Sequence, residues 1–205
     1  MIPSWKTTEN VFVKKGDTWA SGSLHPETNT PRATLKGTLS GVTLAANNEI
    51  TLQFPKRGPI TYNGQQGTLA DIEANYDWAT ATATVESVAA NGEIIVADNV
   101  TFVNHQAIVK FTLKNSSGAA LNATNLQVVV TGPVTTDSYY IDRTETGEIN
   151  EFYVALPGFS NKTVTLIATG SDNKTYTYSR GGVTFANGTY YTRDVKLTQS
   201  NYQSN

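Results

Sequence analysis

The sequence contains no cysteine, which excludes three kinds of chemistry. The chain can form neither a disulfide framework nor a thiolate zinc site, and it has no cysteine nucleophile. It has only two histidines, His25 and His105, which are far apart in the sequence and show no HxH or HExxH spacing. A histidine-based zinc site or triad would need further ligands or a nucleophile beside them. Phosphate-binding loops of the GxGxxG or GxxxxGKS/T type are also absent. We therefore expect no cofactor, no metal and no enzymatic activity.

Long apolar runs and clusters of charge of one sign are missing as well. No apolar stretch approaches the roughly 20 residues that a membrane-spanning helix needs. The formal net charge is −2 over 205 residues, and basic residues gather only in pairs such as Lys14-Lys15 and Lys56-Arg57. Because nucleic-acid binding needs a clustered basic face, we expect no nucleic-acid partner.

What the sequence does contain is a series of short runs in which apolar and polar residues alternate. The run 107–113 places Ile108, Lys110 and Thr112 on one face and apolar residues on the other. The run 35–54 alternates in the same way, although glycines and asparagines interrupt it. A period of two residues is typical of strands that bury one face.

Turn residues separate these runs and give the expected organisation of the chain. Asn91-Gly92 and the stretch GSDNK at 170–174 each lie between two strand-like runs, which predicts hairpins. Short strands at this spacing, without long helices, indicate β-sandwiches rather than an α/β fold. Because each half holds enough strands for its own core, we predict an all-β chain of two tandem β-sandwich domains, residues 1–103 and 104–205.

One stretch, YNGQQGTLADIEANYDWA, departs from the strand pattern. Thr68 followed by Asp71 resembles a capping box at the start of a helix. An apolar face follows at helical spacing, made of Leu69, Ile72 and Tyr76. Neighbouring carboxylates on one short helix are not the pair held about 5–10 Å apart that a glycosidase needs. We predict one short helix near residues 68–76 that closes an end of a sandwich, with its acids in solvent.

Aromatic residues are the candidates for stacking against a ligand. Trp5, Trp19 and Trp78 are candidate glycan-stacking residues, of the kind found in carbohydrate-binding modules. The pairs Tyr139-Tyr140 and Tyr190-Tyr191 are also prominent. Adjacent strand residues face opposite sides of a sheet, so each pair should give one buried and one exposed ring rather than a shared platform.

Four stretches in order resemble the fimbrillin-like, type V pilin-related surface proteins of Gram-negative anaerobes. These stretches are YNGQQGTLADIEANYDWATATATV, VTFVNHQAIVKFTLKNSSGAAL, FYVALPG and VTFANGTYYTRDVKLT. The opening WKTTENVFVKKGDTW resembles the first ordered segment of that family. The resemblance covers nearly the whole chain, although each motif alone is a strand-turn pattern.

The resemblance implies two transthyretin-like β-sandwich domains and a place at the cell surface. Members of the family are exported as lipoproteins and anchored at the outer membrane. Many are trimmed by a protease after an arginine, which opens a groove for a strand from the next subunit. Arg32, in TNTPRATL, is the candidate processing site. We expect membrane contact only through a lipid anchor that is not present in this chain, which resembles a truncated or mature form.

The last strand-like run supplies a candidate donor strand. Its alternating residues are Tyr191, Arg193, Val195 and Leu197. A sandwich that lacks a strand exposes unpaired backbone groups and part of its core. An extended segment from a neighbour satisfies both, through backbone hydrogen bonds and alternate side chains.

Two functions of different classes follow from these expectations. The first is a structural or adhesive subunit of a cell-surface fimbria, or pilus, that assembles by strand exchange. Its partners would be other pilin subunits, copies of itself, or a host protein or glycan. The alternative is a glycan-binding surface lipoprotein of a saccharide-uptake system.

Overall fold

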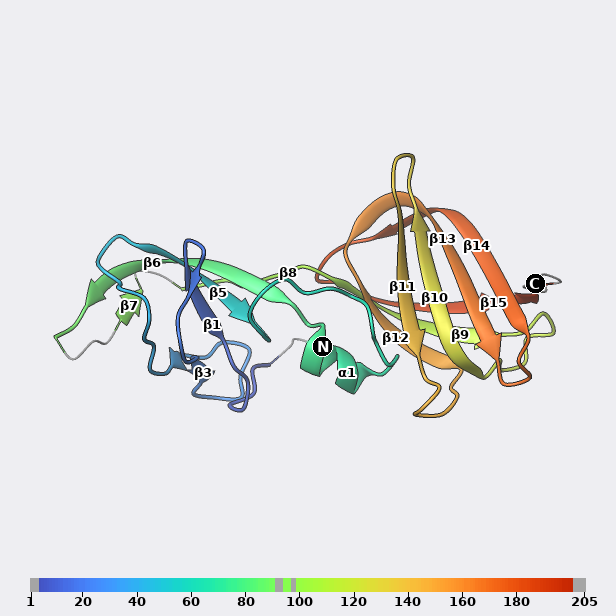
Figure 1. Cartoon of the computed structure of the whole chain (residues 1–205), viewed down its shortest axis with the longest axis horizontal. Coiled ribbons are helices and arrows are strands. Elements are labelled where there is room, and N and C mark those ends of the chain that lie inside the picture. The colour runs from blue at the N-terminus through green and yellow to red at the C-terminus, as the bar shows by residue number, and fades with distance from the viewer. Residues whose placement is uncertain (1–3, 91–93, 97–98, 201–205) are drawn as a thin grey trace. The chain divides into compact units, whose positions relative to one another are not determined.

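The computed structural model describes residues 4–90, 94–96 and 99–200 (Figure 1). Within these ranges the regular structure consists of strands and a single short helix. The predicted all-β sandwich fold with one short helix is therefore confirmed. In the described part of the chain, no helix is long and apolar enough to cross a membrane.

The chain forms two compact units. Unit 1 comprises Met1–Ile60 and Asp77–Asn104, and unit 2 comprises Thr61–Tyr76 and His105–Asn205. The predicted domains differ from these units mainly in residues 61–76, which the prediction assigned to the N-terminal domain of residues 1–103. The structure places this segment in unit 2 instead, because its backbone and side chains bond to strands of that unit, as described below.

Unit 1 is built on one antiparallel sheet and a two-stranded ribbon. Its strands are β1 (Phe12–Lys15), β2 (Thr18–Trp19), β3 (His25–Pro26), β4 (Leu35–Lys36), β5 (Glu49–Phe54), β6 (Ala79–Val88), β7 (Ile94–Val96) and β8 (Val103–Asn104). The sheet has the order β2-β1-β5-β6-β7, β8 also pairs with β6, and β3 pairs with β4. Val11, Val13, Ile50, Leu52 and Val85 are central to its core. β6 and β7 are antiparallel, as a hairpin requires, whereas the predicted turn Asn91-Gly92 lies outside the described residues.

The predicted strand run 35–54 is strand only at its two ends, in β4 and β5. Residues 37–48 form no regular strand. A Cβ on Gly37 would lie 2.1 Å from the backbone oxygen of Ser23, and Gly41 has a φ of +79°. The close approach of the backbone at Gly37 and the left-handed conformation of Gly41 therefore determine the course of the chain. The strand prediction is wrong for residues 37–48.

Unit 2 is a sandwich of two sheets around one core. Its elements are α1 (Leu69–Asn75), β9 (Ala107–Lys114), β10 (Ala123–Thr131), β11 (Thr136–Asp142), β12 (Glu151–Leu156), β13 (Phe159–Gly170), β14 (Thr175–Phe185), β15 (Tyr190–Lys196) and β16 (Thr198–Gln199). One sheet has five strands in the order β11-β10-β13-β14-β16, and the other has three in the order β12-β9-β15. Phe111 and Phe152 from the smaller sheet join Leu126 and Leu166 from the larger one in the shared core.

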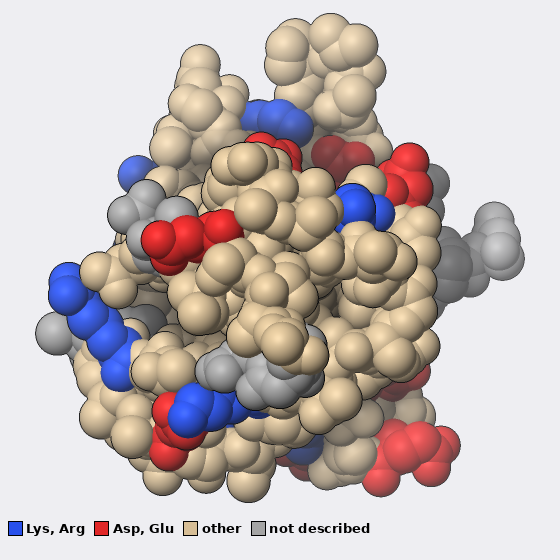
Figure 2. Space-filling model, turned by 90° about the vertical axis from the view of Figure 1, so that its left-hand side faces the viewer, with Lys and Arg blue, Asp and Glu red and all other residues tan. Residues whose placement is uncertain are grey.

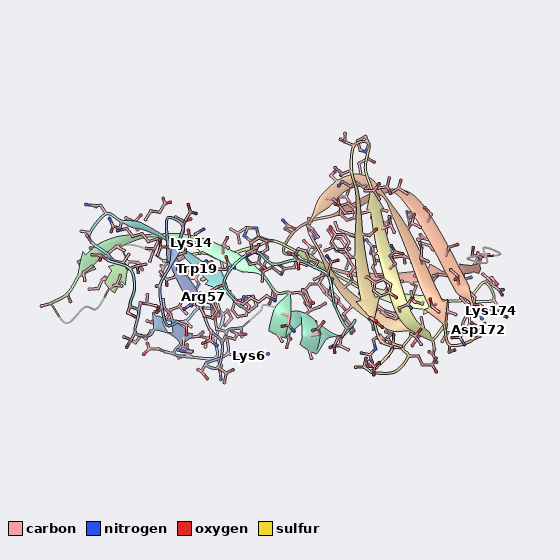
Figure 3. The ribbon with its side chains drawn as sticks, in the orientation of Figure 1. Lys6, Lys14, Trp19, Arg57, Asp172 and Lys174 are labelled. Atoms are coloured by element: carbon pink, nitrogen blue, oxygen red, sulfur yellow. The ribbon has the colours of Figure 1, made fainter. Side chains whose placement is uncertain are left out.

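Two predictions for unit 2 are confirmed strand by strand. In β9 every second residue is buried, and Ile108, Lys110 and Thr112 lie on the partly exposed face. The turn at 170–174 joins β13 to β14 in an antiparallel hairpin. Asp172 accepts a hydrogen bond from the Lys174 amide in this turn, at 3.1 Å (Figure 3).

The helix α1 confirms the capping prediction but not the whole apolar face. Thr68 is the N-cap, and its hydroxyl accepts from the Asp71 amide at 3.2 Å. Ile72 is completely buried and Tyr76 is nearly so, but Leu69 is 41% exposed, contrary to the prediction. The Asp71 carboxylate accepts from the Gln66 amide and the Asn75 side chain, at 2.8 and 2.9 Å. The Asp71 carboxylate therefore stabilises the turn at the start of α1.

Residues 61–67, here called the sealing segment, join the edges of the two sheets of unit 2. The Asp142 amide at the end of β11 donates to the Gln65 carbonyl at 3.1 Å. The Tyr153 amide in β12 donates to the Gly67 carbonyl at 2.9 Å. Because β11 and β12 are the edge strands of different sheets, the segment closes the seam between them.

The Gln65 side chain fixes this segment inside the protein. It is completely buried, and its amide nitrogen donates to the carbonyls of Tyr62 and Ala155, at 2.7 and 2.9 Å. Its amide oxygen accepts from the Ala155 backbone at 2.7 Å. Gly67 lies against the core with a φ of +73°, and a Cβ there would lie 2.9 Å from the Phe152 ring.

Substitutions in the sealing segment are expected to destabilise unit 2. Gln65→Leu leaves both backbone groups of Ala155 without their buried partner, so we expect a loss of about 2–5 kcal/mol in the free energy of unfolding. Gly67→Ala drives a methyl group into Phe152 and should cost about 1–3 kcal/mol beyond the cost of left-handed backbone. The measurement is urea unfolding followed by tyrosine fluorescence. Trp5, Trp19 and Trp78 all belong to unit 1, so their emission reports that unit separately.

Gly147→Ala is the matched control for Gly67→Ala. Gly147 also lies in unit 2 and has a φ of +88°, but a Cβ there would meet nothing within 4 Å. Equal destabilisation by the two substitutions would show that the close packing of Gly67 contributes nothing.

Candidate functional site

The candidate donor strand is β15, which forms an edge of the smaller sheet of its own unit. It runs parallel to β9 and pairs with it at seven positions, from Tyr190 with Ile108 to Lys196 with Lys114. The parallel direction was not predicted from the sequence. Whether β15 is donated to another copy stays a prediction.

Three of the four predicted donor residues point into unit 2. Val195 is 5% exposed and Leu197 is completely buried. Tyr191 lies 4.8 Å from Phe185 between ring centroids, and its hydroxyl accepts from the Ala186 amide at 2.9 Å. Arg193 is exposed, with its guanidinium 5.3 Å from the centre of the Tyr191 ring. Of these four alternating residues, three are therefore packed against unit 2 and one, Arg193, carries an exposed charge.

The chain passes from one sheet to the other immediately after β15. The Leu197 amide donates to the Lys114 carbonyl at 2.8 Å, and β16 then pairs with Tyr176 and Thr177 of β14. The C-terminal segment therefore closes the second seam of the sandwich, between the edges formed by β15 and β16.

The hinge before β15 is short and held at several points. Residues 186–189 connect β14 to β15. The Asn187 side chain accepts from the Gly158 amide at 2.6 Å, and the Gly188 amide donates to the Gln106 carbonyl at 2.8 Å. These contacts fix where the terminal strand leaves the body of unit 2.

Two ion pairs cross the outer face of the smaller sheet. Lys114 lies 2.5 Å from Asp194 on β15, and Lys110 lies 2.7 Å from Glu151 on β12. The hydrogen bond from Lys114 lowers the pKa of the Asp194 carboxyl below its ordinary value. The hydrogen bond to Glu151 raises the pKa of Lys110. Sequence reasoning missed both pairs, because they depend on the register of β9 with its two neighbours.

The three tryptophans predicted for glycan stacking lie in unit 1. Trp5 packs edge-on against Phe54 and Phe102, with ring centroids 5.7 and 5.2 Å apart. Trp19 is half-buried beneath Lys14, whose ammonium lies 5.8 Å from the ring centre (Figure 3). Trp78 is also half-buried. Trp5 therefore contributes to packing, and a stacking role for these residues stays a prediction.

The tyrosine pairs behave as predicted. Tyr139 and Tyr191 pack against the core of unit 2. Their neighbours Tyr140 and Tyr190 are 46% and 52% exposed. Each pair is therefore divided between the two faces of its sheet.

Arg32, the candidate processing site, is exposed in the loop between β3 and β4. The Thr30 hydroxyl bonds to the Arg32 carbonyl, and the Trp5 amide donates to the Thr30 carbonyl at 3.1 Å. The loop is thus accessible but internally bonded, and cleavage after Arg32 stays a prediction.

Charges of both signs are distributed over the surface. Figure 2 shows Lys and Arg side chains interspersed with Asp and Glu over the face that it presents. Among the described residues, no group of three or more His, Cys, Asp or Glu side chains could hold a metal ion.

Comparisons with known proteins find likeness only among solved structures. No family matches in a scan against known protein families, and no curated protein matches the sequence. A Bacteroides ovatus structure, provisionally named a cell adhesion protein, is 18% identical with a TM-score of 0.48, covering 96% of this chain and 87% of its own. A Bacteroides uniformis structure of the same provisional name is 13% identical with a TM-score of 0.49. The match covers 95% of this chain and 92% of that structure's chain. A third structure, from Bacteroides fragilis, is 11% identical with a TM-score of 0.43. The match covers 96% of this chain and 85% of that structure's chain.

The Asp194 ion pair makes the stability of unit 2 depend on pH. Because the folded-state pKa is lowered, the ionised carboxylate stabilises the fold above the ordinary carboxyl pKa, which is about 4. That contribution is lost as the pH falls through the lowered value. Asp194→Asn should therefore lower the melting temperature of unit 2 at pH 7 and have a smaller effect at pH values of about 2.

The control for this prediction is Asp137→Asn on β11, where the carboxylate lies 3.9 Å from Lys162. It should change the melting temperature much less at either pH, because its ion pair is longer. An Asp194→Asn effect that is the same at both pH values would contradict a contribution from the ionised carboxylate.

Proposed function

We propose that this protein is a structural or adhesive subunit of a cell-surface fimbria that assembles by exchanging β15 and β16 between copies. The role is non-catalytic, and the protein is exported and attached at the outer membrane. Its partners are copies of itself or related subunits. The proposal is of the same kind as the cell-adhesion names of the Bacteroides neighbours, but it rests on the sequence resemblance and on the arrangement of unit 2.

The observation that carries the proposal is the position of β15. It is an edge strand, and it pairs with the central strand of the smaller sheet. An edge strand can leave its own unit and make identical contacts in a neighbouring copy. The backbone ladder to β9 and the sites of Val195 and Leu197 would be filled again in the exchanged form.

The energetics favour exchange over simple release. Free release of β15 exposes Val195 and Leu197, and full exposure of such a side chain costs roughly 1.5–3 kcal/mol. Release also leaves the backbone groups of β9 without their partners along one side. Exchange restores both kinds of contact, so its remaining costs are the entropy of association and the opening of the hinge at 186–189.

The form of the product depends on symmetry. When two copies exchange strands reciprocally, the result is a closed dimer. When each copy gives β15 to the next and accepts from the previous one, the contact is heterologous and an open filament results. A fimbria requires the second arrangement.

Introduced cysteines test the exchange directly, because the natural chain has none. Thr112 on β9 lies opposite Asp194 on β15 in the parallel ladder, so Thr112→Cys and Asp194→Cys would face each other. The two single variants are purified separately, mixed, allowed to assemble and then oxidised. Exchange predicts a mixed disulfide between the two variants on non-reducing gels, identified by mass, and the double variant should become locked as a monomer.

Glu151→Cys is the matched control for the donor position. Glu151 also lies opposite Thr112, but on β12, which the sealing segment bonds on its other side. Thr112→Cys mixed with Glu151→Cys should give no more than background cross-linking. Equal yields for the two mixtures, or no mixed disulfide with Asp194→Cys, would contradict exchange of β15.

A further inference from the structure

A pocket opens in unit 2 where α1, β12 and the loop between β11 and β12 meet. Its volume is about 380 Å³, and its walls include Leu69, Glu148, Asn150, Glu151 and Tyr153. This size is within the range of small-molecule sites, about 300–1,000 Å³. None of the residues predicted from the sequence to carry function lies in it.

The walls of this pocket are held in place by a buried arginine. Arg143 is 9% exposed, and its guanidinium donates to the carbonyls of Gly147 and Thr146 at 2.9 and 3.1 Å. A third hydrogen bond, of 3.0 Å, reaches the Gln66 carbonyl in the sealing segment. Arg143 therefore ties the loop that carries Glu148 to the segment that leads into Leu69. Both walls are fixed before any ligand arrives, which reduces the ordering cost of binding.

The lining combines apolar surface with groups that accept hydrogen bonds. Tyr153 contributes an aromatic ring, whose centre lies 5.7 Å from the Lys110 ammonium, and Leu69 is 41% exposed. Glu148 offers a carboxylate, while Asn122 and Asn150 can both donate and accept. A matching ligand has an apolar face for the ring and several hydroxyl groups for the acceptors.

The charge of the pocket narrows the class of ligand. Glu151 is paired with Lys110 at 2.7 Å, so Glu148 is the one carboxylate of the lining without a close ion-pair partner among the described residues. A negatively charged ligand would be repelled by Glu148. A basic side chain would find a single exposed carboxylate, and such exposed pairs contribute about 0–1 kcal/mol. The Lys110 ammonium over the Tyr153 ring is neutralised by Glu151, so a neutral ligand is favoured.

We propose that this pocket binds a neutral saccharide, stacked on Tyr153 and hydrogen-bonded by Glu148, Asn122 and Asn150. The exposed Tyr190 extends the same sheet face, because it lies opposite Ile108 while Tyr153 lies opposite the next outward residue, Lys110. Two rings on one face suit an oligosaccharide better than a single sugar. For its role at a cell surface the site rests on the proposed function, to which it would give an adhesion target.

Repetition along a fimbria would strengthen binding at a site this open. Each copy carries one such pocket, and linked copies convert later binding events into intramolecular ones. The gain in avidity can reach about 10²–10⁴-fold without any new contact. The natural target would therefore be a surface that displays many copies of the saccharide.

A glycan array tests the proposal with the full chain. The probes are immobilised neutral oligosaccharides built from hexose and N-acetylhexosamine units, with sialylated and sulfated forms beside them. The natural protein should bind a subset of the neutral probes. Tyr153→Ala should weaken that binding by about tenfold or more, because it removes the stacking ring. Tyr153→Phe should retain most of it, since the ring remains.

Tyr140→Ala is the matched control, because Tyr140 is an exposed tyrosine on β11 of the same unit but not part of the pocket. Its binding should equal that of the natural protein. If Tyr153→Ala fails to fold, Leu69→Ala and Glu148→Gln test the same pocket at exposed positions. Each should weaken binding several-fold while the far-ultraviolet circular dichroism stays unchanged.

Several results would overturn the proposal. These are the absence of binding to any neutral probe, binding that persists in the pocket variants, and loss of binding on Trp19→Ala instead. Capture of lysine-rich peptides, abolished by Glu148→Gln, would make the pocket a cation site and also overturn it. Cross-linking between copies reports strand exchange separately, so either proposal can fail while the other stands.

Discussion

Unit 2 is held together by the closure of its two seams. A sandwich of two sheets has edge strands on both sides, and their backbone groups and the core behind them need cover. On one side, Gln65 bonds both backbone groups of Ala155 while Asp142 bonds the Gln65 carbonyl. On the other side, the chain crosses between the sheets at the buried Leu197.

The two closures differ in how they can open, and this difference gives the protein its proposed function. The sealing segment is internal to the chain and is held by a completely buried amide, so it cannot leave without disrupting unit 2. In the C-terminal closure, β15 and β16 each bond along one side, to β9 and β14. On the proposed function, the second passes to another copy while the remaining core stays together. Arg143 extends the effect of the first closure, because it fixes the pocket beside it.

Local patterns in the sequence predicted part of the local structure. Alternation identified β9 and its buried face, and Thr68 marked the start of α1, because both signals depend on residues close together in the chain. The sequence did not predict that residues 61–67 belong to unit 2, since a buried Gln65 reveals its partner only in three dimensions. The parallel pairing of β15 with β9 was missed for the same reason, and with it the Lys114–Asp194 pair. The pocket at Tyr153 is formed by segments that are distant in sequence, so no sequence motif predicts it.

Hydrogen exchange by mass spectrometry on the assembled and unassembled protein distinguishes the opening of the two closures. We expect the C-terminal closure to open as a unit, while the sealing segment opens only with the whole of unit 2. In the unassembled protein, amides of β15 and β16 should exchange together, faster than those of β12 and residues 65–67, and assembly should slow them selectively. Equal protection of both closures in the unassembled protein, or no change in β15 on assembly, would show that β15 and β16 do not open separately and are not exchanged.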